Sequence, residues 1–219
     1  MNSPFISLLV LAGIAIFLIM RLRNVLGTRE GFEKPPVNPL EHRSDKHRDF
    51  EVIEGGPDLD ITDHVEDGSD AAKALAAMKL AEHGFSVSAF LDGARDAYEM
   101  ILMAFENGDV DGLRPFLADD VLETFEDVIR QREEQGLSIE ANFVGIRELT
   151  LQDASFDRQT STAEVTVRFV GELTSVVKNA DGEVVEGDPN EINRQRDVWT
   201  FYRVMGRSDP NWTLVATGG

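Results

Sequence analysis

The sequence predicts an α+β fold in which N-terminal helices pack on a curved antiparallel sheet of about four strands, preceded by one transmembrane helix. Three observations lead to this prediction. The first twenty residues are uncharged and mostly apolar, apolar residues recur every three or four positions between Ser69 and about residue 135, and from Leu137 onward they alternate with polar ones. Helices followed by strands in this order are typical of a helical layer covering one face of an antiparallel sheet.

Size and charge limit the functions that the chain can have. Its 219 residues, 42% of them hydrophobic and 13 of them Phe, are enough for one folded domain with extensions. There are 40 acidic against 21 basic side chains, a net charge of −19, which excludes nucleic-acid binding by charge alone. The chain has no Cys, which excludes disulfides, thiol catalysis and Cys-ligated metal sites.

Residues 1–23 are expected to be a single-pass transmembrane anchor. No charged residue lies between Asn2 and Met20, and a helix of this length reaches about 28 Å, close to the roughly 30 Å of a hydrocarbon core. A cleaved signal peptide is the alternative, but no basic residue precedes the run and no small-x-small site follows it. The basic residues that follow are Arg21, Arg23 and Arg29.

These membrane-proximal arginines predict the topology. By the positive-inside rule the short N-terminus lies outside, and the remainder of the chain lies on the cytoplasmic side of the cell inner membrane. The same arginines are also suited to hold anionic lipid head groups.

Residues 24–68 are expected to be an acidic flexible linker. They contain four of the eight prolines, and residues 49–70 carry nine acidic and no basic side chains. Such a composition cannot bury enough apolar surface to order itself. Some apolar residues interrupt the acidic run, and they leave open a short motif that binds a partner or docks on the domain: Phe50, Val52, Ile53, Leu59 and Ile61.

Residues 69–219 are expected to form the folded domain. Apolar periodicity predicts helices from Ser69 to Gly84, from about Ser86 to Asn107, and from about Asp120 to Gln135. Their expected N-caps are Ser69, Ser86 or Ser88, and Asp119 or Asp120. Alternating segments rich in β-branched and aromatic residues predict strands at Asn142–Gln152, Thr162–Val177, Arg196–Met205 and Trp212–Thr217.

Four segments of this domain resemble, in order, the blocks of the translocase-of-inner-membrane subunit 44-like family. The segments are FLDGARDAYEMILMAFENGD, ETFEDVIRQREEQG, STAEVTVRFVGEL with DGEVVEGDPNEI, and RDVWTFYRVMGRSDPNWTLVAT. They cover about Phe85 to Thr217. The most particular positions are Phe90, Gly93, Ala94, Tyr98, Gly108, Asp109, Arg132, Gly136, Trp199, Phe201, Arg203, Pro210 and Trp212.

The resemblance implies a cone-shaped fold of the nuclear-transport-factor-2-like or cystatin-like type, a deep apolar pocket, and association with an inner membrane. Mitochondrial members tether a seventy-kilodalton heat-shock chaperone to the import channel. This chain differs because it carries its own anchor and a short acidic linker, as bacterial membrane-anchored relatives do. The resemblance therefore implies a membrane-anchored adaptor or scaffold, and the chaperone role does not transfer directly.

A curved sheet wrapped around helices tends to enclose a cavity, so we expect an apolar pocket for a lipid or an apolar peptide. Tyr98 is expected to be a core residue whose hydroxyl reaches a backbone partner. The expected pocket residues are Phe90, Tyr98, Ile101, Val165, Val167, Trp199 and Phe201.

An enzyme of the isomerase or hydratase type, acting on an apolar small molecule, is the alternative function, although we expect no catalytic residues. All four His precede Gly84, so acid–base chemistry would fall to carboxylates or to Tyr98 and Tyr202. Burial of Asp92, Asp96 or Asp109 in the cavity beside a tyrosine would favour this alternative. No nucleotide-binding loop is present. Asn107 to Gly112 resembles a calcium loop, but Asn replaces the first ligand and Ala118 replaces the bidentate Glu, so neither metal nor cofactor is expected.

The partners expected from these features are membrane lipid and a protein that the sequence does not identify. By resemblance, that protein is a chaperone or a translocation component, and nucleic acid is excluded by the charge. A homo-oligomer with a purely structural role remains a further possibility.

Overall fold

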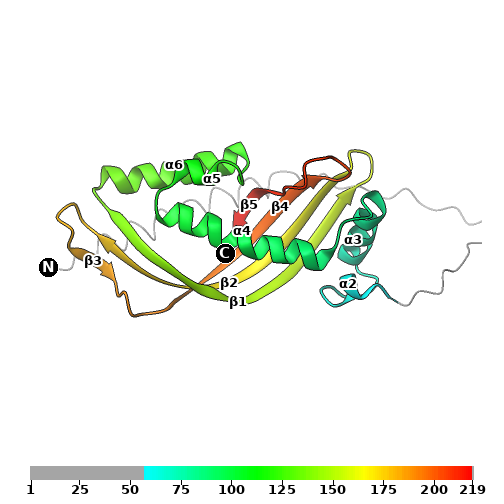
Figure 1. The fold of residues 1–219 in the computed structure, drawn as a ribbon, viewed down its shortest axis with the longest axis horizontal. Helices are drawn as coiled ribbons and strands as arrows, with labels where there is room; N and C mark the ends of the chain where they lie inside the picture. The colour runs from blue at the N-terminus through cyan, green and yellow to red at the C-terminus, as the bar shows by residue number, and fades with distance from the viewer. Residues whose placement is uncertain (1–56, 219) are drawn as a thin grey trace, which may run out of the picture. The chain divides into compact units, whose positions relative to one another are not determined.

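Helices cover one face of a long, curved antiparallel sheet in the computed structural model, which describes residues 57–218 (Figure 1). The helices come first in the chain: α2 (Leu59–Thr62), α3 (Asp70–Ala81), α4 (Val87–Glu106), α5 (Val110–Leu113) and α6 (Asp119–Glu134). The strands follow: β1 (Ser138–Asp157), β2 (Thr162–Lys178), β3 (Val184–Gly187), β4 (Asn193–Val204) and β5 (Thr213–Gly218). The predicted α+β class and the predicted order of elements are therefore confirmed.

The sheet has the order β1-β2-β4-β5, with every neighbouring pair antiparallel. The ladder between β1 and β2 is interrupted by three register shifts, which lie between Phe143 and Gly145, Ile146 and Glu148, and Leu151 and Asp153. Irregularities of this kind bend a strand and increase its twist. They account for the curvature seen in Figure 1, along which α4 lies.

Strand β3, which the sequence analysis did not predict, pairs with the end of β2 beyond the reach of β4. Val176 of β2 pairs with Gly187 of β3, and Leu173 of β2 pairs with Asn193 of β4. Strands β3 and β4 therefore act as two parts of one long partner of β2, and residues 188–192 form an excursion between them. All residues from Ala180 to Arg194 are exposed.

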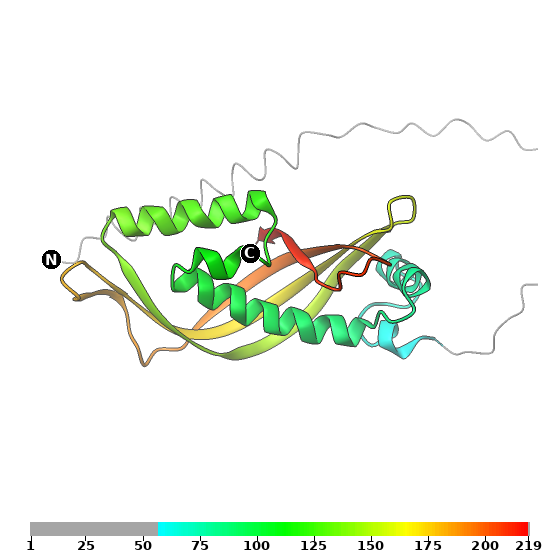
Figure 2. The same cartoon turned by 45° about the horizontal axis from the view of Figure 1, so that its top comes forward.

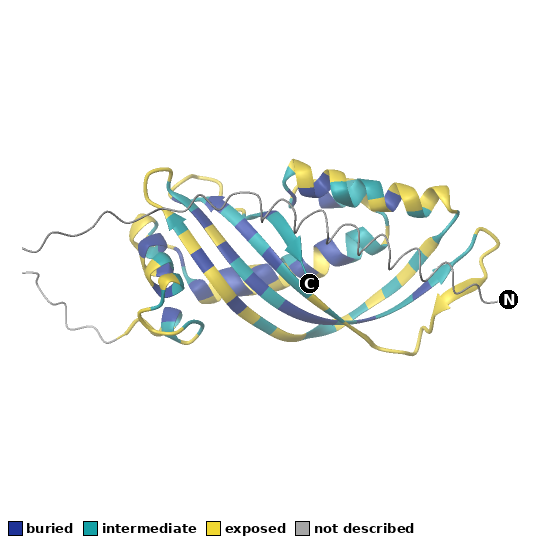
Figure 3. Cartoon of the chain, turned by 180° about the vertical axis from the view of Figure 1, so that it is seen from behind, coloured by how far each residue is buried: buried dark blue, intermediate teal, exposed yellow. Residues whose placement is uncertain are grey.

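The core lies between α4 and the concave face of the sheet. Figure 3 shows buried and exposed residues alternating along the strands, as expected for a sheet covered on one face. Helix α6 runs beside α4 and α5 (Figure 2), and the rings of Phe105 and Phe125 meet there at 4.8 Å between centroids. The buried residues of α4 recur every three or four positions, as the apolar periodicity of this segment predicts: Val87, Phe90, Leu91, Ala94, Tyr98, Ile101 and Leu102.

Two of the three predicted helix starts are confirmed. The side chains of Ser69 and Ser86 accept hydrogen bonds from the backbone N–H groups of Ala72 and Ala89. The prediction for α6 was wrong, because its N-cap is Ala118 and no side chain caps it. A backbone hydrogen bond from Ala118 N–H to the Leu214 carbonyl ties this helix start to β5 instead.

The folded part begins before Ser69. Residues 57–68 lie in the segment predicted to be linker, yet they include α2, whose Ile61 is buried in the core. Of the apolar residues that left open a motif docking on the domain, Ile61 does pack in the core, whereas Leu59 is 66% exposed.

The predicted anchor at residues 1–23, its arginines Arg21, Arg23 and Arg29, and the motif at Phe50, Val52 and Ile53 all lie outside the described residues. Within residues 57–218, no helix is long and apolar enough to cross a membrane.

We predict that Gly171 of β2 tolerates no side chain. A carbon atom added at Gly171 would lie 2.6 Å from the hydroxyl oxygen of Tyr98, so Gly171→Ala must displace a packed aromatic ring. Overpacking of this kind costs about 1–3 kcal/mol, which urea denaturation of the full chain would measure. Gly145→Ala in β1 is the matched control, since an added carbon there meets no atom within 4 Å. Equal stability of the two variants would contradict the packing described.

Candidate functional site

Tyr98 lies at the centre of the aromatic core. Its ring is fully buried, stacks on Phe169 at 4.4 Å between centroids, and contacts Trp199 at 4.8 Å. Its hydroxyl donates a 2.6 Å hydrogen bond to Oδ2 of Asp197 on β4. The partner is therefore a side-chain carboxylate, and the expectation of a backbone partner was wrong.

Asp197 is a half-buried carboxylate at the edge of this aromatic cluster, and it was not among the carboxylates named from the sequence. Its other oxygen, Oδ1, accepts a 3.2 Å hydrogen bond from Nε2 of Gln195. Burial raises the pKa of Asp197, and hydrogen bonds from Tyr98 and Gln195 offset only part of that rise. Burial and the Asp197 carboxylate raise the pKa of Tyr98. The hydroxyl is therefore held protonated as a donor, which is the opposite of an activated base.

The seven predicted pocket residues all lie in the core. Phe90 packs against Phe201 and Trp212 at centroid distances of 5.9 and 4.7 Å. Tyr98 and Trp199 contact one another, and Ile101, Val165 and Val167 are at most 1% exposed. These side chains fill the space between α4 and the sheet, because the large aromatic rings occupy the volume that the curvature creates. Binding of a lipid or peptide among them stays a prediction that this packing does not favour.

The carboxylates named for the alternative enzyme function lie elsewhere. Asp92 and Asp96 are exposed on α4. Asp109 is also exposed and accepts a hydrogen bond from the Gly112 N–H as the N-cap of α5. The loop that resembles a calcium site therefore turns the chain between α4 and α5. Across residues 57–218, no group of three acidic or His side chains is arranged to hold a metal ion.

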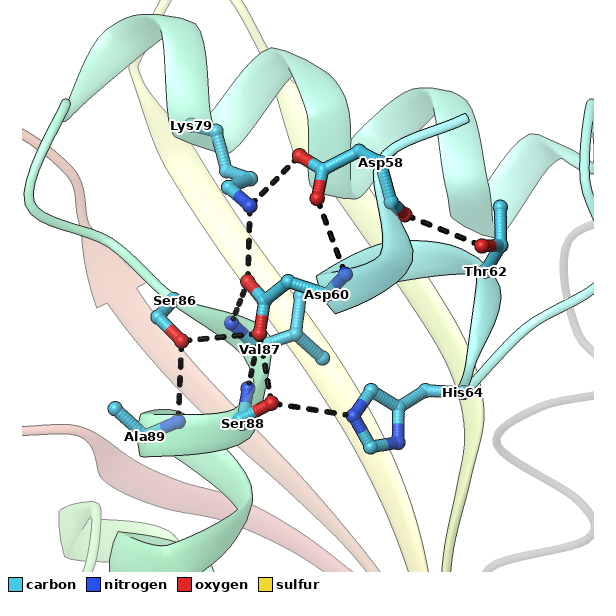
Figure 4. A network of polar contacts seen from close by, with 9 residues as sticks. All are labelled: Asp58, Asp60, Thr62, His64, Lys79, Ser86, Val87, Ser88 and Ala89. Carbon is cyan, nitrogen blue, oxygen red and sulfur yellow. Dashed lines mark hydrogen bonds and ion pairs between the residues drawn. The ribbon is translucent and has the colours of Figure 1, made fainter. Parts of the chain in front are cut away.

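A second polar cluster joins α2 to the start of α4 (Figure 4). The carboxylate of Asp60 accepts five hydrogen bonds. Its Oδ1 accepts from Ser86 Oγ, Ser88 N–H and Ser88 Oγ, and its Oδ2 accepts from Val87 N–H and Lys79 Nζ, all between 2.7 and 3.0 Å. We call these five residues, Asp60, Lys79, Ser86, Val87 and Ser88, the Asp60 clamp.

The clamp stabilises the ionised form of the Asp60 carboxyl group. Burial alone would raise the pKa of this carboxyl, but hydrogen bonds from Lys79, Ser88 and Val87 lower it well below its usual range. A carboxylate at the N-terminus of α4 also complements the helix dipole. Neither the Asp60 acceptor nor the Lys79 donor was identified from the sequence, where Asp60 is one of nine acidic residues between positions 49 and 70.

A third cluster closes the end of the domain where α3 meets the β4–β5 loop. Arg203, which is buried, donates to the side chain of Glu82 and, at 2.9 Å, to the carbonyl of Pro210. Its guanidinium also lies 5.3 Å from the ring centre of Trp212. The bond from Arg203 lowers the pKa of Glu82.

Arg132 of α6 likewise joins two elements, here at the C-terminal end of α4. Its guanidinium donates to the Phe105 carbonyl, lies 4.6 Å from the centre of the Phe105 ring, and is 3.7 Å from Glu106. A cation at the last carbonyl groups of a helix complements the dipole there. Arg132 thus fixes α6 against the C-terminus of α4.

One shallow groove lies between α3 and the end of β1, with a volume of about 310 Å³. Its walls include Lys73, Ala74 and Ala77 of α3 and Ala154 and Phe156 of β1. None of the predicted pocket residues lines it.

The Tyr98–Asp197 pair generates a prediction with a pH signature. At neutral pH, Tyr98→Phe removes a hydrogen bond to a charged acceptor and should lower the free energy of unfolding by about 1.5–3 kcal/mol. The loss should shrink as the pH falls toward the ordinary Asp pKa of 3.8, and the decline should begin above that value, because burial raises the pKa of Asp197 and its carboxyl is therefore protonated in the folded state at a higher pH. Urea denaturation of the full chain between pH 3 and 8 measures both effects.

Tyr202→Phe is the control, since Tyr202 pairs with exposed Glu164 on the opposite face of the sheet. A pH-independent loss in Tyr98→Phe would mean that packing alone, and not the bond to Asp197, is affected.

Comparison with known proteins identifies relatives of this chain. Human mitochondrial import inner membrane translocase subunit TIM44 is 28% identical over 122 residues, which are 55% of this chain and 26% of that protein. The mouse protein of the same name is 26% identical over the same length. The chain therefore spans about a quarter of the length of these relatives.

Two solved structures resemble the chain more distantly. The intermembrane space region of chloroplast protein ARC6 gives a TM-score of 0.38 at 10% identity and covers 60% of this chain and 92% of that one. A ketosteroid isomerase-like protein from Erwinia carotovora atroseptica gives 0.31 at 12% identity and covers 56% and 88%. Neither likeness is close enough to support a conclusion about function.

The family comparison matches the Tim44-like domain over residues 71–219, which is most of the chain and nearly all of its described part. The segments that carry the resemblance in the sequence lie within this range. The chain belongs to the Tim44-like domain family.

Proposed function

We propose that the chain is a membrane-anchored adaptor or scaffold, whose domain binds a protein partner of the translocation or membrane-assembly machinery. The observation that carries this proposal is the family match over residues 71–219 in a chain that also contains an uncharged apolar run from Asn2 to Met20. The matched relatives are named as subunits of an inner membrane translocase. A spanning run followed by arginines would place the domain at the cytoplasmic surface of the inner membrane.

Binding is favoured over chemistry because the polar side chains of the described core bind one another, and among the described residues the Nε of Arg203 is the one buried side-chain nitrogen or oxygen atom left without a hydrogen bond. The hydroxyl of Tyr98 is committed to Asp197, and Arg203 is committed to Glu82 and Pro210. A catalytic acid or base must reach a substrate, whereas Tyr98 is enclosed by Phe169 and Trp199. The isomerase-like alternative is therefore the weaker proposal.

The partner would meet the outer surface of the domain, since the predicted pocket residues are packed together. Exposed aliphatic side chains occur at separate places, including Met100 on α4 and Val184 and Val185 on β3. With a chain charge of −19, complementary basic surface on the partner would speed its association. The chaperone role of the mitochondrial relatives would need additional binding segments and is not part of this proposal.

The proposal predicts that the full chain stays in the membrane pellet after an alkaline carbonate wash. It also predicts that photo-crosslinkers at Met100 and Val185 capture an integral membrane or translocation protein in cells. Leu9→Lys with Ile16→Lys should release the chain, since each charge at mid-membrane costs about 2.5–3.5 kcal/mol.

The matched control for this experiment is Leu9→Ile with Ile16→Leu, which keeps the run apolar. Release of the unaltered chain by carbonate would contradict the anchor. Retention in the pellet without any crosslinked membrane or translocation protein would contradict the adaptor role.

A further inference from the structure

Several side chains join residues 57–68 to the rest of the domain: Asp58 binds Lys79 at 2.7 Å, His64 lies 3.5 Å from Ser88 Oγ, and Val65 packs against the core. Two others make the most extensive connections. The Asp60 carboxylate enters the clamp, and Ile61 enters the core with 5% of its surface exposed. The neighbouring Leu59 is 66% exposed, and Asp58 and Asp63 are exposed as well. Most of this segment therefore lies on the surface, and a four-residue helix such as α2 has little stability of its own.

Helix α4 does not depend on this segment for its start. Ser86 accepts a hydrogen bond from the Ala89 N–H with its own side chain, whether or not Asp60 is present. The groups that Asp60 satisfies, including the N–H groups of Val87 and Ser88, lie at the helix end, where water can replace the carboxylate. Lys79 belongs to α3 and would return to solvent. We therefore expect α4 to keep its Ser86 cap when α2 separates from it.

The connection to α3 also permits separation. Gly68 has φ +73°, and Ser69 begins α3 with its own side-chain cap. The segment that ends at Gly68 thus meets a helix that starts independently of it.

We propose that residues 57–68 are a detachable strap, held by Asp60 and Ile61, which opens as a unit while α4 and the sheet stay folded. Local opening of a small element at a lower free energy than global unfolding is a general property of proteins. The effect of this opening on the distance between the domain and the membrane rests on the proposed function. In a tethered domain, release of the strap adds twelve residues to the tether, which span up to about 40 Å when extended. The strap then sets how far the domain works from its anchor, and tension on the tether opens it.

The test is native-state hydrogen exchange of the full chain in detergent micelles. Asp60→Asn removes the charge that Lys79 and the helix terminus bind, and it should speed exchange at least tenfold at the amides of residues 61–65, Val87 and Ser88. The amides of β2 and β4 should keep their protection. Asp63→Asn is the matched control, because Asp63 is exposed and its side chain makes no hydrogen bond among the described residues.

Two outcomes would overturn the strap. Unchanged exchange in Asp60→Asn would mean that the clamp does not hold the segment, and loss of protection in β2 and β4 together with the segment would mean that it cannot open separately. Ile61→Ala tests the same unit through its apolar contact and should give the same pattern if Asp60→Asn fails to fold. The measurement needs neither membrane nor partner, so its failure is distinct from failure of the adaptor proposal.

Discussion

The contact between Tyr98 and the sheet organises the rest of the domain. One ring of α4 stacks on Phe169, its hydroxyl binds Asp197, and Gly171 leaves the space that the ring occupies. A polar bond inside an aromatic core is strong only in one arrangement, since moving α4 along the sheet would leave Asp197 buried without its donor. The contact therefore fixes the position of α4, and α6 follows through Arg132.

Many of the positions that resemble the family are explained by such contacts. Arg203 binds the Pro210 carbonyl and packs on Trp212, Arg132 binds the end of α4, and Asp109 caps α5. Each of these contacts holds parts of the fold together. Gly93 is different, because an added carbon there meets no atom within 4 Å, and nothing in the structure explains it.

Local features of the fold were predictable because they depend on neighbouring residues. The stripe that includes Phe90, Ala94 and Ile101 marked α4, Ser86 marked its start, and the alternation around Val165 marked β2. Features that depend on distant partners were not. Tyr98 and Asp197 are 99 positions apart, and the start of α6 is set by a backbone bond to β5 where the sequence offers Asp119 and Asp120.

In the candidate site, too, features that depend on neighbouring residues were predictable and those that depend on distant partners were not. An apolar face could be read from the pattern, but the pattern does not reveal whether facing side chains leave a space or fill it. Asp60 was hidden among other acids, and only the folded chain brings it to the N-terminus of α4, 27 positions from Val87. Ile61 was visible in the sequence only as one of several apolar residues in an acidic segment.

A double-mutant cycle on the full chain tests the central contact most directly. Tyr98→Phe, Asp197→Asn and the double variant would be compared with the unaltered chain by urea denaturation at neutral pH. Residues in direct contact typically show interaction free energies of about 0.5–3 kcal/mol, and we expect a value in the upper half of that range. Additive losses, with no interaction free energy, would show that the bond does not position α4 and would contradict this account of the fold.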